Sequence, residues 1–344
     1  MISPTCGQPF ASGADPTDPA HMGRRPSPLS PFLLTLDARM REVARPQGGV
    51  VTAAQCRALG VADAAVRRLI SAGTWTRARH GVYADASFRA PEVDARHHAR
   101  CAALLACLTA PAVVSHLSAA RLLGLPLPPG QNDERACVTR RPPAPTNDPL
   151  LGDVHVVDYD DADVLTVDGV PVLAGARLVV DCCDVLPPES ALAVADVALA
   201  RRLTTVADLR AAIWARRHRP NARVREQVAE RADPLAESWF ESISRWWLLE
   251  AGLPRPRLQV PFADADGRVR ARVDMLIGRV VGEADGAVKY TDPAAILAEK
   301  QREDWLRDVH GLEVVFARRS VGLRAERLSD QRKCHQLHYP DQEG

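Results

Sequence analysis

The chain has 344 residues, which is long enough for two or three domains with apolar cores of their own. Apolar residues make up 46% of it, and its formal net charge of +1 excludes an overall attraction to nucleic acid or membranes, so any DNA binding must come from local basic patches. The sequence contains no run of about 18 apolar residues, so no membrane span is predicted. The eight cysteines form no paired CxxC motifs, which argues against a zinc knuckle and favours a reduced, cytoplasmic protein.

Residues 1–34 are rich in proline, glycine and serine, so we expect a disordered N-terminal tail. Residues 35–90 follow the order helix, turn, helix, hairpin, which predicts a winged helix-turn-helix. In "VVTAAQCRALG", Thr52 is followed three residues later by Gln55, the spacing of a capping box. A second short helix follows in "VADAAVRRLISAG", and "WTRARHGVYA" predicts two short β segments around Gly81.

The second of these helices is the candidate recognition helix. Val66, Leu69 and Ile70 fall on one helical face, whereas Arg67 and Arg68 fall off it and are expected to contact DNA. The wing would bring three further side chains near phosphates, namely Arg77, Arg79 and His80. The alternative is a small helical module whose arginines are merely solvated.

Residues 91–230 alternate helical and strand patterns, and we expect an α/β middle domain. The predicted helices are 94–109, "SHLSAARLLGLPLP", 174–186 and 188–201, and the predicted strands are 135–140 and 153–158. The acidic run from Asp158 to Asp163 lacks the glycine and final glutamate of an EF-hand and is expected to be a solvated loop. The segment "ARRHRPNARVR" is the densest basic stretch of the chain, and we expect a linker there, with phosphate contact as the alternative.

Residues 231–325 predict a last domain with the order α-β-β-β-α-β. Its first helix, "DPLAESWFESISRWWLLEAGLP", is expected to start at Asp233 and Pro234 and to stop at Gly252. Three strands follow near 257–262, 268–277 and 279–284, then a helix near 293–309 and a final strand in "GLEVVFAR". Residues 326–344 are expected to be a C-terminal tail.

Acidic residues interrupt these apolar strands. Glu283 and Asp285 share one face of their strand, and Asp274 lies near the end of the neighbouring one, so three carboxylates would converge. A divalent cation would relieve that repulsion and could activate water at a phosphodiester, with Lys289 stabilising the transition state and Glu237 completing the site. The alternatives are a structural ion-pair network and a solvated turn at the Asp-Gly pair.

Two resemblances extend these predictions. The stretch "GGVVTAAQCRALGVADAAVRRLISAGTWTRARHGVYA" resembles the winged helix of AbiEi-type antitoxins of type IV toxin–antitoxin systems, and "VVSHLSAARLLGLPLP" with "VDGVPVLAGARLVVDCCD" is similar to the middle region of actinobacterial relatives. The resemblance implies a winged helix that binds promoter DNA and represses its own operon, beside a cognate toxin encoded nearby.

The C-terminal strings "ESWFESISRWWLLEAGLPRPRLQVPF", "VDMLIGRVVGEADGAVKY" and "AEKQREDWLRDVHGLEVVFAR" resemble the very-short-patch-repair-endonuclease-like domain of the PD-(D/E)XK superfamily. The resemblance implies that Asp274 and Glu283 bind Mg²⁺, or Mn²⁺ in its place. It matches Glu237 to the helix glutamate and Lys289 to a downstream basic residue. One departure is that Asp285 stands where the superfamily usually has a lysine. Three further residues match positions around the site of that family, namely Asp285, Arg302 and Asp304.

We therefore expect an α+β protein with a winged helix-turn-helix, an α/β middle domain and a restriction-endonuclease-like domain. The predicted function is a DNA-binding, antitoxin-like transcriptional regulator whose nuclease-like domain binds Mg²⁺ and cleaves DNA. The alternatives are a non-catalytic repressor with a structural or partner-binding C-terminal domain, and a defence or repair endonuclease. DNA and a cognate toxin are the expected partners.

Overall fold

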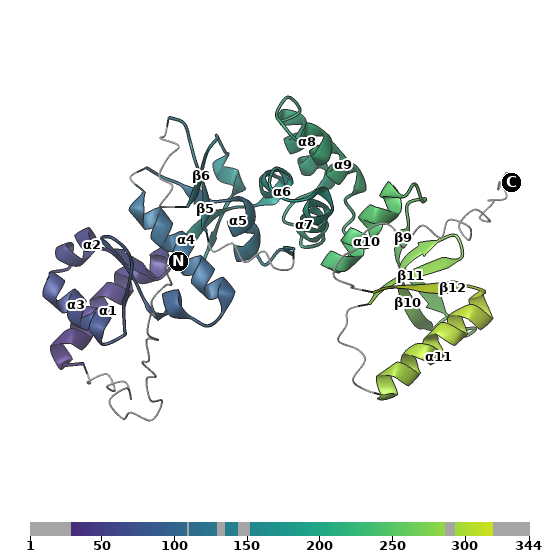
Figure 1. Cartoon of the computed structure of the whole chain (residues 1–344), viewed down its shortest axis with the longest axis horizontal. Coiled ribbons are helices and arrows are strands. Elements are labelled where there is room, and N and C mark those ends of the chain that lie inside the picture. Colours follow the sequence, from purple (N-terminus) through teal and green to yellow (C-terminus); the bar gives the residue numbers. More distant parts are fainter. Residues whose placement is uncertain (1–28, 109, 129–134, 144–151, 286–292, 319–344) are drawn as a thin grey trace, which may run out of the picture.

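The structure is a computed structural model that describes residues 29–108, 110–128, 135–143, 152–285 and 293–318. The described part is a mixed α+β molecule with three sheets. Figure 1 shows α1 to α3 at one end of an elongated molecule and the sheet of β9 to β12 at the other. None of the described helices combines the length and the apolar composition needed to cross a bilayer.

The N-terminal unit has the element order of a winged helix-turn-helix. Its elements are α1 (Pro31–Ala44), β1 (Val50–Thr52), α2 (Ala53–Ala58), α3 (Asp63–Ser71), β2 (Thr76–Arg79) and β3 (Val82–Ala84), and its antiparallel strands lie in the order β1-β3-β2. The predicted capping box is present: Gln55 N–H donates to Thr52 Oγ1 (3.2 Å), and Thr52 N–H donates to Gln55 Oε1 (2.8 Å). The expected tail is shorter than predicted, because α1 starts at Pro31 and buries Leu33; residues 1–28 lie outside the described part.

The small sheet of this unit is buried on both faces. Val51 and Tyr83 point into the core formed with α1, α2 and α3, where Trp75 is also buried. Val50 and Val82 point the other way, into the larger core of the middle unit. Because strand side chains alternate between faces, the winged helix and the middle unit share these strands.

The middle unit is built on a five-stranded mixed sheet. Its elements are α4 (Val93–Cys107), β4 (Val113–Val114), α5 (His116–Leu122), β5 (Cys137–Arg140), β6 (Asp153–Val156), β7 (Val164–Val167) and β8 (Val170–Leu173), with the strand order β6-β5-β4-β8-β7. The sequence patterns had predicted only β5 and β6 of these strands. His97 of α4 is buried and lies 2.9 Å from Ser118 Oγ, so it is a core residue and not a surface one.

Four helices follow the sheet: α6 (Gly175–Cys183), α7 (Pro188–Ala200), α8 (Val206–Ala215) and α9 (Ala222–Arg231). The basic stretch expected to be a linker is therefore the last residue of α8, the turn after it and the first turn of α9. Arg225 of α9 is buried and forms an ion pair with Asp184. A linker would leave this guanidinium in water, whereas here it is part of the helical core.

The C-terminal unit has the predicted α-β-β-β-α-β order. Its elements are α10 (Trp239–Glu250), β9 (Arg257–Ala263), β10 (Val269–Ile277), β11 (Val280–Asp285), α11 (Pro293–His310) and β12 (Glu313–Arg318), with the strand order β12-β11-β10-β9 and β12 parallel to β11. The predicted start of α10 is wrong: Ser238 caps it, and Leu235 is 53% exposed ahead of it. The predicted tail, residues 326–344, lies outside the described part.

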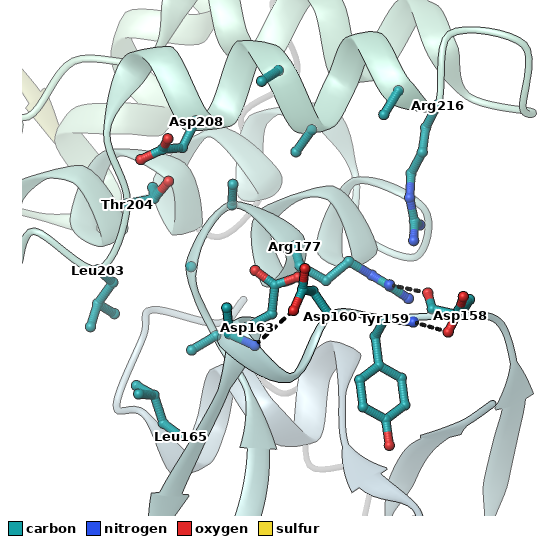
Figure 2. Close-up of a pocket in the computed structure, with 17 residues that line it drawn as sticks. Asp158, Tyr159, Asp160, Asp163, Leu165, Arg177, Leu203, Thr204, Asp208 and Arg216 are labelled. Atoms are coloured by element: carbon teal, nitrogen blue, oxygen red, sulfur yellow. Dashed lines mark hydrogen bonds between the residues drawn. The ribbon is translucent and has the colours of Figure 1, made fainter.

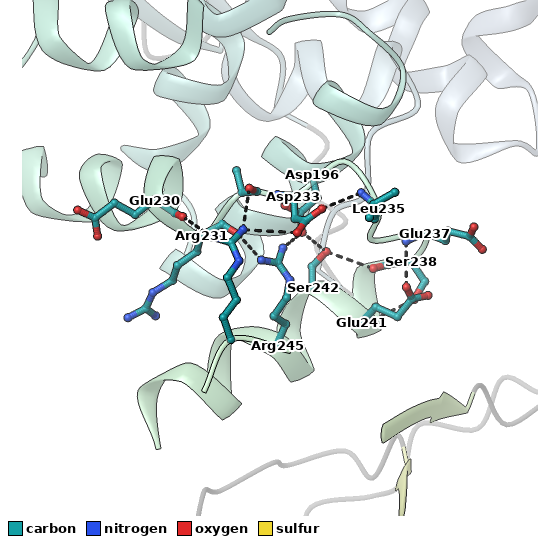
Figure 3. Close-up of polar contacts among 12 residues, drawn as sticks. Asp196, Glu230, Arg231, Asp233, Leu235, Glu237, Ser238, Glu241, Ser242 and Arg245 are labelled. Atoms are coloured by element: carbon teal, nitrogen blue, oxygen red, sulfur yellow. Dashed lines mark hydrogen bonds and ion pairs between the residues drawn. The ribbon is translucent and has the colours of Figure 1, made fainter. Parts of the chain in front are cut away.

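Helix α10 packs against both the middle unit and its own sheet. Arg245 and Asp196 of α7 form a fully buried ion pair, and Asp196 also accepts hydrogen bonds from Ser242 Oγ (2.6 Å) and Asp233 N–H (2.7 Å) (Figure 3). Burial raises the pKa of Asp196, and the Arg245 charge opposes that rise. Trp246 adds an apolar contact to the core of the middle unit, so α10 joins α7 to the last sheet.

Candidate nucleic-acid interface

Helix α3 separates apolar and cationic side chains as its sequence predicted. Val66 and Leu69 are buried in the winged-helix core, and Arg67 and Arg68 are exposed. Gly73 follows the helix with φ +78°, a conformation that favours glycine and ends the helix before β2. Both arginines are therefore available to a partner at the surface of the unit.

The β2–β3 hairpin forms a short wing beside this helix. Arg77 and His80 are exposed, whereas Arg79 is half-buried. The register shifts between Arg77 and Arg79, and Gly81 turns the chain with φ +72°. Of the three expected wing contacts, Arg77 and His80 have the exposure that phosphate contact requires.

The acidic residues of the C-terminal unit lie in a row across its sheet. Met275 pairs with Gly282 in the antiparallel β10–β11 ladder, and the same register places Asp274 opposite Glu283. In the same way, the pairs on either side of Gln259 bring it opposite Asp274 on the next strand. Residues opposite each other in an antiparallel pair share a face, so two carboxylates and one amide occupy one row. The register thus places Asp274 and Glu283, two of the three carboxylates expected to converge, on one face of the sheet.

An arginine from α11 meets this row. Arg302 Nη1 lies 3.1 Å from Glu283 Oε1, and Glu283 is buried while Asp274 is half-buried. The guanidinium supplies the positive charge that the sequence argument had assigned to a cation. In this arrangement Glu283 is a member of an ion pair.

The helix carboxylate that reaches the row is Glu241. Glu237 lies before α10, is about half exposed, and forms a two-pronged ion pair with Arg272 (2.6 and 2.8 Å). Glu241 Oε2 instead accepts from Gln259 Nε2 (3.0 Å), and burial raises the pKa of Glu241, with the nearby Asp274 charge adding to the rise. The spacing of Ser238 and Glu241 is that of a capping box, a signal in the sequence that would have identified this glutamate.

The magnesium site stays a prediction, because part of its expected residue set lies outside the described residues. No group of three histidine, cysteine, aspartate or glutamate side chains lies close enough there to hold a metal. Glu283 is neutralised by Arg302, and neither the side chain of Asp285 nor Lys289 lies within the described residues.

The acidic run after β6 lines a cavity of about 640 Å³ between α6 and α8 (Figure 2). Arg177 crosses its floor and donates from Nη1 to the Asp158 carbonyl (2.6 Å). Asp158 and Asp160 are exposed, and Asp163 is half-buried, with a pKa raised by burial. The run is thus largely solvated, as expected.

Two stacked histidines form a further polar cluster in the middle unit. The rings of His116 and His155 lie 3.7 Å apart between centroids and are nearly parallel at 18°. His116 has φ +52° and lies 2.9 Å from Ser115 Oγ through Nδ1. Burial lowers the pKa of His116 to about 3, and the positive potential of Arg177 and Arg216 adds to this, so the ring is neutral at pH 7. The sequence patterns gave no indication of this cluster.

Residues 38–84 match a family model described as "Transcriptional regulator, AbiEi antitoxin". The N-terminal unit is antitoxin-like. The match begins within α1 and ends at the last residue of β3, so it includes α3 and the β2–β3 hairpin of this antitoxin-like unit. No curated protein matches the chain significantly.

Proposed function

We propose that the protein is a transcriptional regulator whose antitoxin-like unit binds promoter DNA upstream of its own coding sequence. One observation carries the proposal. The winged helix matches an antitoxin family model, and its helix α3, the second of the helix-turn-helix pair, exposes Arg67 and Arg68. A helix in the major groove with a wing on the flanking backbone is the usual docking of such units. Arg67 and Arg68 contact phosphates at the edge of the groove, and Arg77 and His80 of the wing supply further backbone contacts.

The test is the salt dependence of binding to a duplex of that upstream DNA. Arg67→Ala combined with Arg68→Ala should weaken binding and lower the log–log salt slope by roughly 1.8, because each lost phosphate contact removes about 0.9. The control is Arg268→Ala with Arg270→Ala, two exposed arginines of the C-terminal unit. If the α3 variant keeps the slope of the wild-type protein, the assignment of this helix to DNA is wrong.

The antitoxin description extends the proposal to a cognate toxin encoded nearby. Expression of the neighbouring gene alone should arrest growth, and co-expression of this chain should relieve the arrest. The Arg67→Ala and Arg68→Ala variant should still relieve it when its own expression is driven from an unrelated promoter, because that substitution affects DNA binding only. If co-expression of this chain does not relieve the growth arrest, the neighbouring gene does not encode its cognate toxin.

A second candidate function is metal-dependent DNA cleavage by the C-terminal unit, favoured by the row that brings Asp274 opposite Glu283 beside Glu241. Cleavage would require a cation to replace Arg302 at Glu283. Supercoiled plasmid with Mg²⁺ or Mn²⁺ should be nicked by the wild-type protein and left intact by Asp274→Ala and Glu283→Ala. Equal nicking by all three would exclude this site, and no nicking by the wild-type protein would leave the unit as a structural or partner-binding module of the regulator.

A further inference from the structure

The turn between α8 and α9 carries a cationic surface around one exposed tryptophan. Trp214 is 68% exposed near the end of α8, although tryptophan is a residue that folding normally covers. From Leu209 to Arg225 the sequence has no acidic residue. Its exposed basic side chains are Arg210, Arg217, His218, Arg219 and Arg223.

The tryptophan and one arginine form a pre-arranged pair. The Arg217 guanidinium lies 4.3 Å from the centroid of the Trp214 ring, and its Nη1 donates to the Trp214 carbonyl at 2.8 Å. The hydrogen bond holds the cation over the ring, so little side-chain freedom remains to be lost on binding. Arg210 lies one helical turn before Trp214 and therefore on the same side of α8.

A buried arginine, Arg225, fixes the shape of the α8–α9 turn from its buried side. Arg225 is fully buried, and its Nη2 donates to the carbonyls of Arg216 (3.0 Å) and Arg219 (3.2 Å), while Nη1 pairs with Asp184. Burying a guanidinium is costly unless it is paired, and both terminal nitrogens of Arg225 have partners. Here that group holds a turn whose outward side chains are an aromatic ring and cations.

We propose that the α8–α9 turn binds single-stranded nucleic acid, with an unpaired base stacked on Trp214 and phosphates contacted by Arg210, Arg217 and Arg219. Positive charge beside an exposed aromatic ring is the combination that binds unpaired strands, because the cations follow the backbone and the ring stacks with any base. In a duplex each base is already stacked on its neighbours. A duplex would therefore contact the arginines through its phosphates, and no base would be available to stack on the Trp214 ring. The site is separate from α3 and the wing, and the inference does not depend on the proposed promoter binding.

The experiment measures fluorescence anisotropy of labelled oligothymidylate and oligouridylate of about 12 nucleotides with the full-length protein over a series of salt concentrations. Trp214→Ala should weaken binding of the preferred oligomer roughly tenfold, and Trp214→Phe should stay within about threefold of the wild-type protein, because phenylalanine still stacks. Arg217→Ala with Arg219→Ala should lower the salt slope by roughly 1.4. The two oligomers distinguish DNA from RNA as the source of the strand.

Two controls separate this site from the winged helix. Phe32→Ala removes an aromatic side chain that is 67% exposed on α1, and it should not change oligomer binding. Arg67→Ala with Arg68→Ala should weaken binding of the promoter duplex and leave oligomer binding unchanged. Thermal melting followed by circular dichroism confirms that each variant is folded.

Three results would overturn the proposal. The first is equal oligomer binding by the wild-type protein and a folded Trp214→Ala variant. The second is a loss of oligomer binding in the Arg67→Ala and Arg68→Ala variant as large as its loss of duplex binding. The third is no saturable binding of either oligomer at the lowest salt concentration.

Discussion

His116 combines a left-handed backbone with a ring that remains neutral. Its φ of +52° is uncommon for any residue but glycine, asparagine and aspartate, and its ring is stacked on His155 within a buried cluster. Protonation would add a charge beside Arg177 and Arg216 in a site that water hardly reaches, which is why the pKa of His116 falls to about 3. Such a residue makes folding sensitive to mild acid.

The sign of that sensitivity follows from proton uptake. The unfolded chain binds a proton at His116 below its ordinary pKa of 6.5, whereas the folded chain does so only near 3. The unfolding free energy should therefore fall as the pH drops from 6.5 toward 3, by up to about 1.4 kcal/mol per pH unit from this group. In His116→Asn, which keeps a residue suited to positive φ, this part of the slope should be missing in urea titrations at pH 4 to 6.5.

Comparison of the two proteins isolates the histidine. Burial raises the pKa of Asp181 and of Asp196, which gives a slope of opposite sign, but both proteins keep these groups. If plots of unfolding free energy against pH run parallel for His116→Asn and the wild-type protein, the ring has no role in the acid sensitivity.

At the scale of elements, the joint between α7 and α10 depends on a fully buried ion pair, Arg245 with Asp196. Asp196→Ala should lower the unfolding free energy by roughly 3–5 kcal/mol, because Arg245 would remain charged and buried without its partner. Asp196→Leu combined with Arg245→Met should lose much less, since neither charge remains. Glu237→Ala, which breaks the exposed pair with Arg272, should cost much less than Asp196→Ala, because water already solvates both charges. Guanidinium titrations measure all three, and equal losses for Asp196→Ala and Glu237→Ala would contradict this account.

Elements whose ends are set by neighbouring residues were predictable from sequence. The capping box of Thr52 and Gln55, the glycine after α3 and the hairpin turn before β10 depend on contacts a few residues apart. Strand β4 has two residues, too few for a period, and it is formed by pairing with β5 and β8, which are distant in the sequence. Strands β7 and β8 form a hairpin across Asp168 and Gly169, and this Asp-Gly turn is a local signal that the sequence predictions missed. Helix α10 was predicted to start too early because Asp233 resembles a cap, whereas its N–H is bound to Asp196.

The difference between local patterns and contacts between distant segments also decides how much of the candidate site could be predicted. Alternation along two adjacent strands was enough to predict that Asp274 and Glu283 share one face of the sheet. The resemblance assigned the helix glutamate to Glu237, which lies before α10, whereas Glu241 lies one turn further on, against Gln259. That Arg302 rather than a cation meets Glu283 depends on how α11 crosses the sheet, which no local pattern records.

At the scale of the whole molecule, the antitoxin-like unit is not an independent module. Val50, Val82 and Ala84 belong to the core of the middle unit, together with residues of α4. A fragment of residues 29–90 should therefore expose this apolar face, melt at a lower temperature than a fragment of residues 29–235, and bind the dye ANS. Differential scanning calorimetry compares the two fragments, and equal melting temperatures would show that the shared strands contribute nothing to the stability of the unit.

The buried Arg225 has a consequence for proteolysis. The stretch it holds contains the densest run of arginines in the chain, and each is a potential trypsin site except Arg219, which precedes Pro220. A protease must draw a segment into its active site in extended form, and this turn cannot extend while Arg225 binds the carbonyls of Arg216 and Arg219. The rate of tryptic cleavage at Arg216 or Arg217 should therefore report how often α9 opens locally. The composition of this stretch alone would instead suggest immediate digestion.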